Sequence, residues 1–147
     1  MHIRAAQSED YLAVYALMQE LDTADTVHNT DERRAVFLNI IDDPSNHIFV
    51  GVSENDIVAT CYLNIIPNIT WKAASYALIE NVVTSTHHRR KGYGRKCIKH
   101  AIEFAYSKGC FKIMLMSSQR DDQTRAFYGS VGLVQSKDGY AMYKEIV

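Results

Sequence analysis

One stretch in the middle of the chain constrains the fold more than any other, because an apolar run there passes through a basic, glycine-containing turn into a helical pattern. Residues 79–84 are rich in β-branched side chains, as strands are. Arg89-Arg90-Lys91 follows, then Gly92 and Gly94. Glycine lets a ligand approach the main chain closely. The first turn of a helix supplies unpaired N–H groups and the positive end of the dipole, so the stretch predicts an anion site.

The glycine pattern limits which kinds of anion this turn could bind. Neither Gly92 nor Gly94 is followed by a Lys-Ser or Lys-Thr pair, which argues against a nucleoside-triphosphate loop. A single Gly-x-Gly also lacks the third glycine of the dinucleotide fingerprint. The net charge of −1 over 147 residues makes the basic turn a local feature, not part of a polyanion-binding surface. The turn therefore favours a small ligand with a pyrophosphate of another kind.

Three segments carry a family resemblance. Arg89-Arg90-Lys91-Gly92-Tyr93-Gly94 resembles the Arg/Gln-x-x-Gly-x-Gly/Ala signature with which the GNAT superfamily of N-acetyltransferases holds the pyrophosphate of acetyl-coenzyme A (acetyl-CoA). Residues 79–84 resemble the central strand of that family, and Ala126-Phe127-Tyr128 with Gly132-Leu133 resembles its later helix and the turn after it. The resemblance implies an α/β (α+β mixed-sheet) fold, with a central twisted mixed sheet flanked by helices, and one acetyltransferase domain over residues 1–147.

The resemblance also implies where acetyl-CoA binds. The backbone of the central strand would pair with the pantetheine arm as though the arm were another strand, and a backbone N–H near Val82 would stabilise the oxyanion. Two positions depart from the family pattern: Arg90 stands where a small residue is frequent, and Asp121 or Asp122 lies near a frequent Asn. The coenzyme-binding residues expected in this way are Val82, Val83, Thr84, Arg89, Arg90, Lys91, Gly92, Tyr93, Gly94 and Arg95.

Two side chains are candidates for the proton transfers of acetyl transfer to an amine. The amine must lose a proton before it attacks, because a lysine amine has a pKa of about 10.4 and a peptide amino terminus one of about 8. In the family pattern Glu80 serves as this base, directly or through water; the alternative is a structural carboxylate that pairs with a basic side chain or bonds to the backbone. Tyr128 resembles the tyrosine that many relatives place beside the coenzyme sulfur as general acid. The alternative is that Phe127 and Tyr128 form the core face of a helix.

The expected reaction is direct attack of a primary amine of a small molecule on acetyl-CoA in a ternary complex. No Cys or Ser stands in an activated setting, so no covalent enzyme intermediate is expected. The resemblance suggests amino sugars, amino acids or polyamines as acceptors, with a protein or peptide amine, or a non-catalytic coenzyme A-binding regulator, as alternatives. A nucleic-acid-binding module is not expected, since such domains are normally basic overall. His87 and His88 are adjacent in a polar loop, which favours surface residues over metal ligands, and no metal is expected.

Composition is typical of one soluble globular domain, with 47% hydrophobic and 22% charged residues. Cys61, Cys97 and Cys110 are odd in number and lie in apolar or amphipathic segments, so we expect reduced, buried thiols. No apolar run is long enough to span a membrane, and Met1-His2-Ile3-Arg4 leads directly into structure, so a cytoplasmic protein without a membrane partner is expected.

The resemblance also allows a homodimer. Trp71 would either fold back onto the sheet or form a pocket or dimer contact.

Hydrophobic periodicity predicts the remaining elements. A first helix begins at Gln7 or Ser8 and continues through Leu21, and Thr30 caps a second helix that Pro44 ends. The apolar run 111–116 is typical of a strand covered on both faces, and a strand, a crossover helix and this strand predict a parallel pair. Further strands are expected over residues 2–6, 47–52, 57–66, 75–84 and 140–146, and further helices over 93–108 and 122–131.

Overall fold

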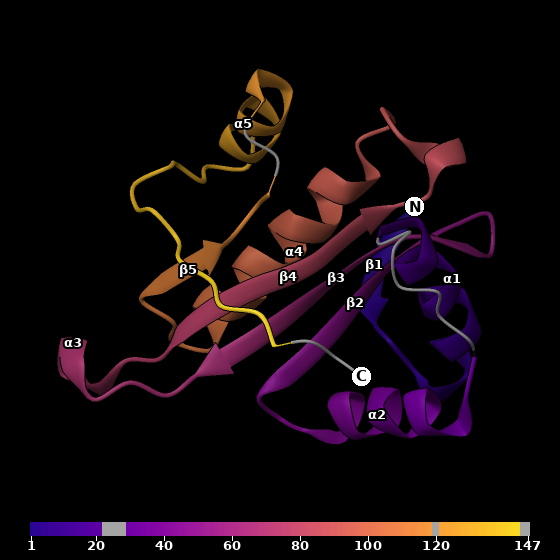
Figure 1. The fold of residues 1–147 in the computed structure, drawn as a ribbon, viewed down its shortest axis with the longest axis horizontal. Helices are drawn as coiled ribbons and strands as arrows, with labels where there is room; N and C mark the ends of the chain where they lie inside the picture. Colours follow the sequence, from indigo (N-terminus) through magenta and orange to yellow (C-terminus); the bar gives the residue numbers. More distant parts are fainter. Residues whose placement is uncertain (22–28, 119–120, 145–147) are drawn as a thin grey trace.

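The structure is a computed structural model that describes residues 1–21, 29–118 and 121–144 (Figure 1). Residues 22–28, which make up most of a polar stretch without a clear sequence signal, lie outside the described part. The elements, in chain order, are β1 (His2–Ala5), η1 (Ser8–Asp10), α1 (Tyr11–Leu21), α2 (Asp31–Asp42), β2 (Asn46–Ser53), β3 (Asp56–Ile66), α3 (Thr70–Ala73), β4 (Tyr76–Thr84), η2 (Thr86–His88), α4 (Tyr93–Ser107), β5 (Lys112–Leu115) and α5 (Asp122–Gly129).

The strands form one mixed sheet in the order β1-β2-β3-β4-β5. Neighbours from β1 to β4 are antiparallel, and β4 pairs with β5 in parallel. The helix α4 connects these two parallel strands, as the predicted strand, crossover helix and strand required. The mixed sheet with flanking helices confirms the predicted fold class.

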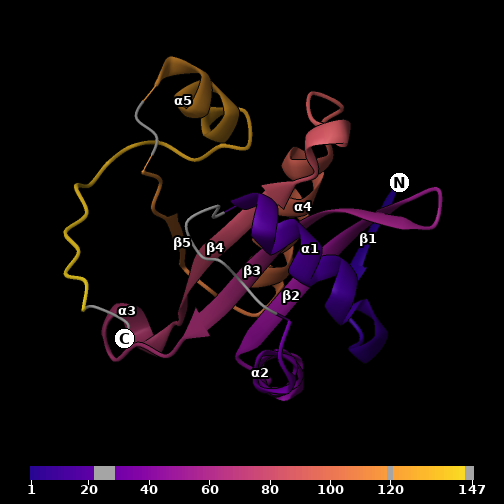
Figure 2. The same cartoon turned by 45° about the vertical axis from the view of Figure 1, so that its right-hand side comes forward.

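Helices cover both faces of the sheet (Figures 1 and 2). On one face, Tyr11 of α1 and Phe37 of α2 pack with Ile48 and Val50. On the other face, the buried stripe of α4 packs with Phe49 and with residues of β3 and β4. Neighbouring residues of β2 therefore point into two different cores, which explains why the strand has a continuous buried run and no polar alternation.

Local sequence signals set most of the element boundaries. The Thr30 side chain accepts a hydrogen bond from the Arg33 N–H at 3.3 Å and caps α2 as predicted. The turn between β2 and β3 places Glu54 and Asn55 at φ of 53° and 72°, the left-handed pair that joins a tight hairpin. Cys61, Cys97 and Cys110 are buried, as predicted. Within the described ranges, no helix has the length and apolar character needed to cross a membrane.

Two predictions about the end of the sheet are wrong. The run 111–116 was expected to be covered on both faces, but β5 is the last strand of the sheet and its four residues are only half-buried. The predicted final strand over 140–146 is not formed in its described part, because residues 140–144 have no strand partner and a strand needs one. Residues 145 and 146 lie outside the described part of the chain.

The short connection between β3 and β4 holds Trp71. Trp71, Lys72 and Ala73 all have left-handed backbone conformations, with φ between 54° and 60°. The Trp71 ring stacks on Phe111 with 5.3 Å between ring centroids, yet the residue remains 71% exposed. The ring thus contacts the sheet through one aromatic neighbour and also remains available as a contact surface.

Candidate active site

The two parallel strands separate halfway along β4. Pairs between them extend from Tyr76 opposite Lys112 to Ile79 opposite Leu115, and β4 then continues to Thr84. The chain after β5 runs toward α5, whereas β4 leads to the start of α4 (Figure 1). The backbone of residues 80–84 is thus free of β5 and can pair with an extended ligand on that side.

A bulge in β4 marks the place of this separation. On the β3 side, Glu80 lies opposite Tyr62 and Val83 opposite Thr60, so two residues of β4 oppose one residue of β3. Asn81 has a φ of 50°, the left-handed conformation of a bulge residue. Sequence reasoning missed this bulge, although Asn tolerates the left-handed region better than most residues.

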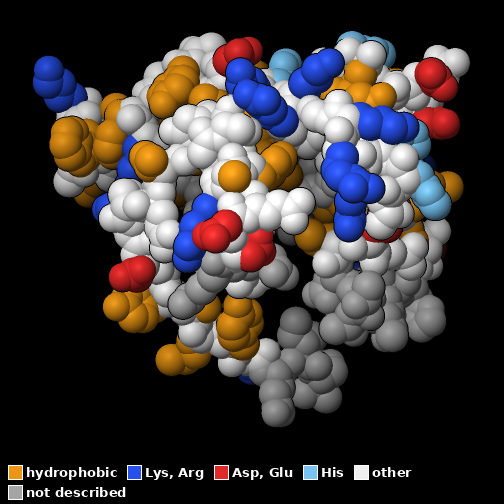
Figure 3. All heavy atoms as spheres, turned by 90° about the horizontal axis from the view of Figure 1, so that it is seen from above, with side chains coloured by type: hydrophobic (Ala, Val, Ile, Leu, Met, Phe, Trp, Pro, Cys, Tyr) orange, Lys and Arg blue, Asp and Glu red, His pale blue; other side chains and the backbone are white. Residues whose placement is uncertain are grey.

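The basic loop after β4 turns sharply into α4. Arg90 and Gly92 have φ of 61° and 79°, and Gly92 is the N-cap of α4. Arg89, Arg90, Lys91 and Arg95 are exposed. Viewed from above, this end of the molecule shows Lys and Arg side chains gathered beside histidines (Figure 3). A helix N-terminus within a set of cations is well suited to phosphate oxygens.

The loop cations make few contacts within the protein. Arg89 donates through Nε to the Thr84 carbonyl at 3.3 Å, and Arg95 donates to the Ser130 carbonyl at 3.1 Å. These bonds connect the loop to the end of β4 and to the end of α5. The exposed guanidinium groups retain further donors for an anion.

Gly94 lets α4 begin close to β4. A β-carbon at this position would lie 2.7 Å from Thr84 Oγ1 and 3.6 Å from Phe127 Cζ. The first contact is shorter than real β-carbons show, so only glycine allows the loop and the end of the strand to lie this close. The neighbouring Tyr93 side chain points elsewhere, since its hydroxyl lies 3.3 Å from Ser53 Oγ and its ring stacks on His88.

The two predicted catalytic side chains come from β4 and α5, and they lie close enough for the charge of one to affect the other. Glu80 is half-buried on β4, and Tyr128 is half-buried on α5, where its ring packs edge-on against Phe127. Burial raises the pKa of Tyr128, a hydrogen bond with Ser117 opposes this shift, and the charge of Glu80 adds to the rise. The phenol therefore keeps its proton at neutral pH.

Ser117 is a further candidate residue beside Tyr128 that no sequence pattern indicated. It lies two residues after the end of β5 and hydrogen-bonds with Tyr128. Its position just beyond a predicted strand was the only available signal.

Asp121, which stands near a frequent family Asn, caps α5 by accepting from the Thr124 N–H at 2.8 Å. That hydrogen bond lowers the pKa of Asp121.

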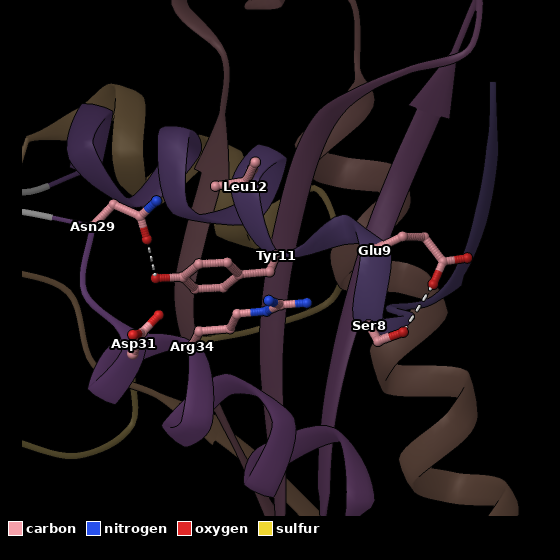
Figure 4. A pocket seen from close by; sticks show the side chains of 7 residues that line it. All are labelled: Ser8, Glu9, Tyr11, Leu12, Asn29, Asp31 and Arg34. Atoms are coloured by element: carbon pink, nitrogen blue, oxygen red, sulfur yellow. Dashed lines mark hydrogen bonds between the residues drawn. The ribbon is translucent and has the colours of Figure 1, made fainter.

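A separate polar hollow of about 310 Å³ lies between α1 and α2 (Figure 4). Tyr11 donates to Asn29 at 2.9 Å within it, and Asp31 and Arg34 of α2 supply charge. Neither β4 nor α5 contributes a lining residue, so the hollow does not include Glu80 or Tyr128. Over residues 1–21, 29–118 and 121–144, no group of three His, Cys, Asp or Glu side chains is arranged to hold a metal ion.

The mixed sheet, the separation of its parallel strands and the basic, glycine-containing N-terminus of α4 agree with the acetyltransferase class that the sequence resemblance implied. Residues 14–133 match the model of the acetyltransferase (GNAT) family. The chain therefore belongs to the GNAT family, as its basic loop predicted.

Solved structures and a curated relative agree with this assignment. A putative acetyltransferase from Agrobacterium tumefaciens is 40% identical, with a TM-score of 0.94 over 98% of this chain and 100% of that one. A glucosamine-6-phosphate N-acetyltransferase from Arabidopsis thaliana shares the fold, with a TM-score of 0.86, 24% identity and 98% coverage of both chains. A glucosamine 6-phosphate N-acetyltransferase from Trypanosoma brucei brucei is 34% identical over 85 residues, which is 58% of this chain and 56% of that relative.

Proposed function

We propose that this protein transfers the acetyl group of acetyl-CoA to the primary amine of a small molecule, with an amino sugar phosphate as the first candidate acceptor. The observation that carries the proposal is the separation of β4 from β5, which leaves the backbone of residues 80–84 unpaired with β5. Glu80 lies close enough to Tyr128 for its charge to raise the pKa of that phenol. The amino sugar is suggested by the name of the Trypanosoma relative.

The coenzyme would lie along the free side of β4. Its pantetheine arm would pair with the backbone of Val82, Val83 and Thr84, as a strand pairs at a sheet edge. Its pyrophosphate would bind the loop and the first turn of α4, where the N–H groups and dipole favour negative charge. The loop residues assigned to this contact are Arg89, Arg90, Lys91, Gly92, Tyr93, Gly94 and Arg95.

The reaction would proceed by direct attack within the ternary complex. Glu80 would take a proton from the acceptor ammonium, directly or through water, and the free amine would attack the thioester carbon. The Val82 N–H would stabilise the oxyanion of the tetrahedral intermediate. When the intermediate breaks down, the carbon–sulfur bond cleaves and Tyr128 donates its proton to the leaving thiolate, which gives an acetamide and coenzyme A.

Two measurements test the coenzyme and the acceptor separately. Calorimetric titration with acetyl-CoA is expected to show saturable binding, and absence of binding by the folded protein would remove the proposal. Release of coenzyme A thiol is then measured with glucosamine 6-phosphate, glucosamine, an amino acid, a polyamine and a lysine peptide. Turnover with the peptide alone would replace the small-molecule acceptor with a protein acceptor, and binding without any turnover would support a regulator.

Replacing Tyr128 with Phe tests the general acid. The change keeps the ring against Phe127 and removes only the hydroxyl. We expect kcat to fall about 100-fold, within the range for general acid catalysis, while the calorimetric affinity for acetyl-CoA stays unchanged. Tyr76→Phe is the matched control, because Tyr76 lies at the opposite end of β4 and should keep full activity. Unchanged kcat in Tyr128→Phe would assign the proton to another donor.

A further inference from the structure

The connection that contains α3 presents apolar side chains at one end of the molecule. It joins β3 to β4 and extends beyond the ends of both strands (Figures 1 and 2). Ile69, directly before α3, is 95% exposed, and Trp71 within α3 is 71% exposed. Single exposed apolar side chains are common on protein surfaces. Two large ones within three positions of a protruding connection indicate a contact surface.

Hydrogen bonds within the connection close it into a compact turn. The Asn68 side-chain amide donates to the carbonyl and to the hydroxyl of Thr70, both at 2.9 Å. The Ala74 N–H donates to the Trp71 carbonyl at 3.2 Å. The polar groups of the turn thus bond to one another, while Ile69 and Trp71 lie on its outside.

The charge around this turn is positive. Lys72 is exposed within α3, and Lys112 begins β5. Lys108, which is exposed at the end of α4, adds a further positive charge nearby in the sequence. No Asp or Glu occurs in residues 57–79 or 104–120. In a chain whose net charge is −1, these two stretches are unusually free of negative charge.

The cations and the aromatic rings lie together. The Lys112 ammonium lies 4.7 Å from the centroid of the Tyr76 ring and 5.4 Å from that of the Phe111 ring. Trp71 stacks on the same Phe111 ring, with 5.3 Å between ring centroids. The folded chain therefore combines apolar and basic side chains in one area, which we call the α3 surface and which comprises Ile69, Trp71, Lys72, Phe111 and Lys112.

An anionic lipid bilayer fits this surface better than a small ligand or a folded protein. A small ligand needs a concave site, whereas α3 protrudes (Figure 1). A stable protein interface buries about 1,200–2,000 Å² in total, and a turn of four residues offers less. A bilayer can take up a few apolar side chains while lysines stay at its negative headgroups. Tryptophan suits this depth, because its ring is apolar and its indole N–H is polar.

We propose that the α3 surface docks the protein on the face of an anionic lipid bilayer. Ile69 and Trp71 enter the interface between headgroups and acyl chains, and Lys72 and Lys112 face the negative headgroups. The basic turn at residues 89–92 follows the other end of β4, so the proposed coenzyme site stays on the side away from the membrane. The expectation of no membrane partner rested on the lack of a spanning run, and binding from one side needs no such run.

The fluorescence of Trp71 tests the proposal directly, because it is the only tryptophan of the chain. The full chain is mixed with vesicles that contain phosphatidylserine and phosphatidylcholine in equal parts. We expect the protein to sediment with these vesicles, the emission to shift to shorter wavelength, and bromine-labelled acyl chains to quench it. Vesicles of phosphatidylcholine alone should bind far less, and added salt should weaken the binding.

Two results of this experiment would overturn the proposal. The first is that the protein does not sediment with the anionic vesicles. The second is sedimentation without any change in the Trp71 emission, which would assign the binding to another surface, such as the basic turn. Retention of the chain on immobilised polyglutamate without binding to vesicles would identify an acidic protein segment as the partner, and it would also overturn the proposal.

Two single changes separate the apolar from the electrostatic contribution and keep Trp71 as the reporter. Ile69→Ser and Lys72→Glu should each weaken vesicle binding at least about tenfold. Both side chains are exposed, so both variants should remain folded by circular dichroism. Val36→Ser and Arg34→Glu make the same kinds of change on exposed positions of α2 and should bind as the wild type does. Unchanged binding in both α3 variants, or an equal loss in the α2 variants, would refute the proposal.

Discussion

Two glycines two positions apart are needed for different physical reasons. Gly92 has a φ of 79°, and a β-carbon added there would meet no atom within 4 Å, so its requirement is one of backbone conformation. Gly94 is helical, and its requirement is space, because a β-carbon would lie 2.7 Å from Thr84 Oγ1. The family signature thus combines a turn residue with a close-contact residue, and substitutions at the two positions should respond differently to changes nearby.

Replacing Gly94 with Ala should therefore be rescued by a change at Thr84. We expect Gly94→Ala to weaken acetyl-CoA binding at least tenfold and to lower the melting temperature, since either the loop or the strand must move. Thr84→Ala removes the clashing oxygen, so the double variant should regain stability, and Ala in a helix adds about 1 kcal/mol relative to Gly. Calorimetry and thermal unfolding of both single variants and the double variant measure this coupling. In contrast, Gly92→Ala should gain nothing from Thr84→Ala, and an equal rescue of both would contradict the steric explanation.

Among the elements, the last turn of α1 is hydrogen-bonded to the start of η2, which precedes the basic loop. The Thr86 N–H donates to a carboxylate oxygen of Glu20 at 2.7 Å, across 66 positions of sequence. Thr86 begins η2, which leads into the loop, so α1 helps to fix where the loop starts. The helix layer on one face of the sheet is thus coupled to the proposed coenzyme site.

Glu20→Ala should loosen this connection. The loss of a hydrogen bond to a carboxylate is worth about 1.5–3 kcal/mol when buried and less at an exposed site such as this. We expect acetyl-CoA affinity to fall three- to tenfold by calorimetry, with little change in the chemical step. Glu20→Gln keeps an acceptor oxygen and should retain most of the affinity. Equal losses in both variants would indicate that the negative charge, not the hydrogen bond, is what matters.

Elements that depend on neighbouring residues could be predicted from sequence, and those that depend on distant partners could not. The strand, loop and helix around Gly92 could be predicted because the spacing of the apolar residues and the glycines occur in one continuous stretch. The Thr30 cap could be predicted for the same reason, since it involves only neighbouring residues. The edge position of β5 could not be predicted, because it depends on whether another strand pairs with its outer side. Glu80 and Tyr128 were identified only through family resemblance. The hydrogen bond between Ser117 and Tyr128 could not be predicted, because folding brings the two residues together and no spacing in the sequence indicates it.

At the scale of the whole molecule, one ion pair ties the first strand to the first helical segment. Arg4 of β1 donates to both carboxylate oxygens of Asp10, at 2.5 and 2.9 Å, and the Gln7 N–H adds a third bond at 2.7 Å. The Arg4 hydrogen bonds hold the pKa of Asp10 below its usual range, against the opposing effect of burial. Asp10 is 6% exposed, so solvent replaces these bonds poorly.

This pair should make stability depend on pH in acid. Because the pKa of Asp10 is lowered in the folded state, its contribution is complete above the usual carboxyl pKa of about 3.9 and is lost as the pH falls through the lowered value. Asp10→Asn should reduce the free energy of unfolding by about 1–2 kcal/mol at pH 7, since Arg4 is partly exposed. The deficit should shrink as the pH falls below about 4. Urea unfolding from pH 2.5 to 7 measures it, with Asp122→Asn on the exposed end of α5 as control. A deficit that is constant over this range would show that Asp10 acts only through its shape.

The buried cysteines allow transient opening of the protein core to be measured as a rate of chemical labelling. Burial raises the pKa of Cys97 to about 12, and it raises the pKa of Cys61 and Cys110 as well. Alkylating reagents react with the thiolate, so these three cysteines should not be alkylated while the core between α4 and the sheet stays closed. Each labelling event then records one excursion in which that core admits solvent, and its frequency gives the free energy of the opening. The rate at which the native cysteines are alkylated therefore reports how often the core opens. Mass spectrometry can measure this rate with and without acetyl-CoA.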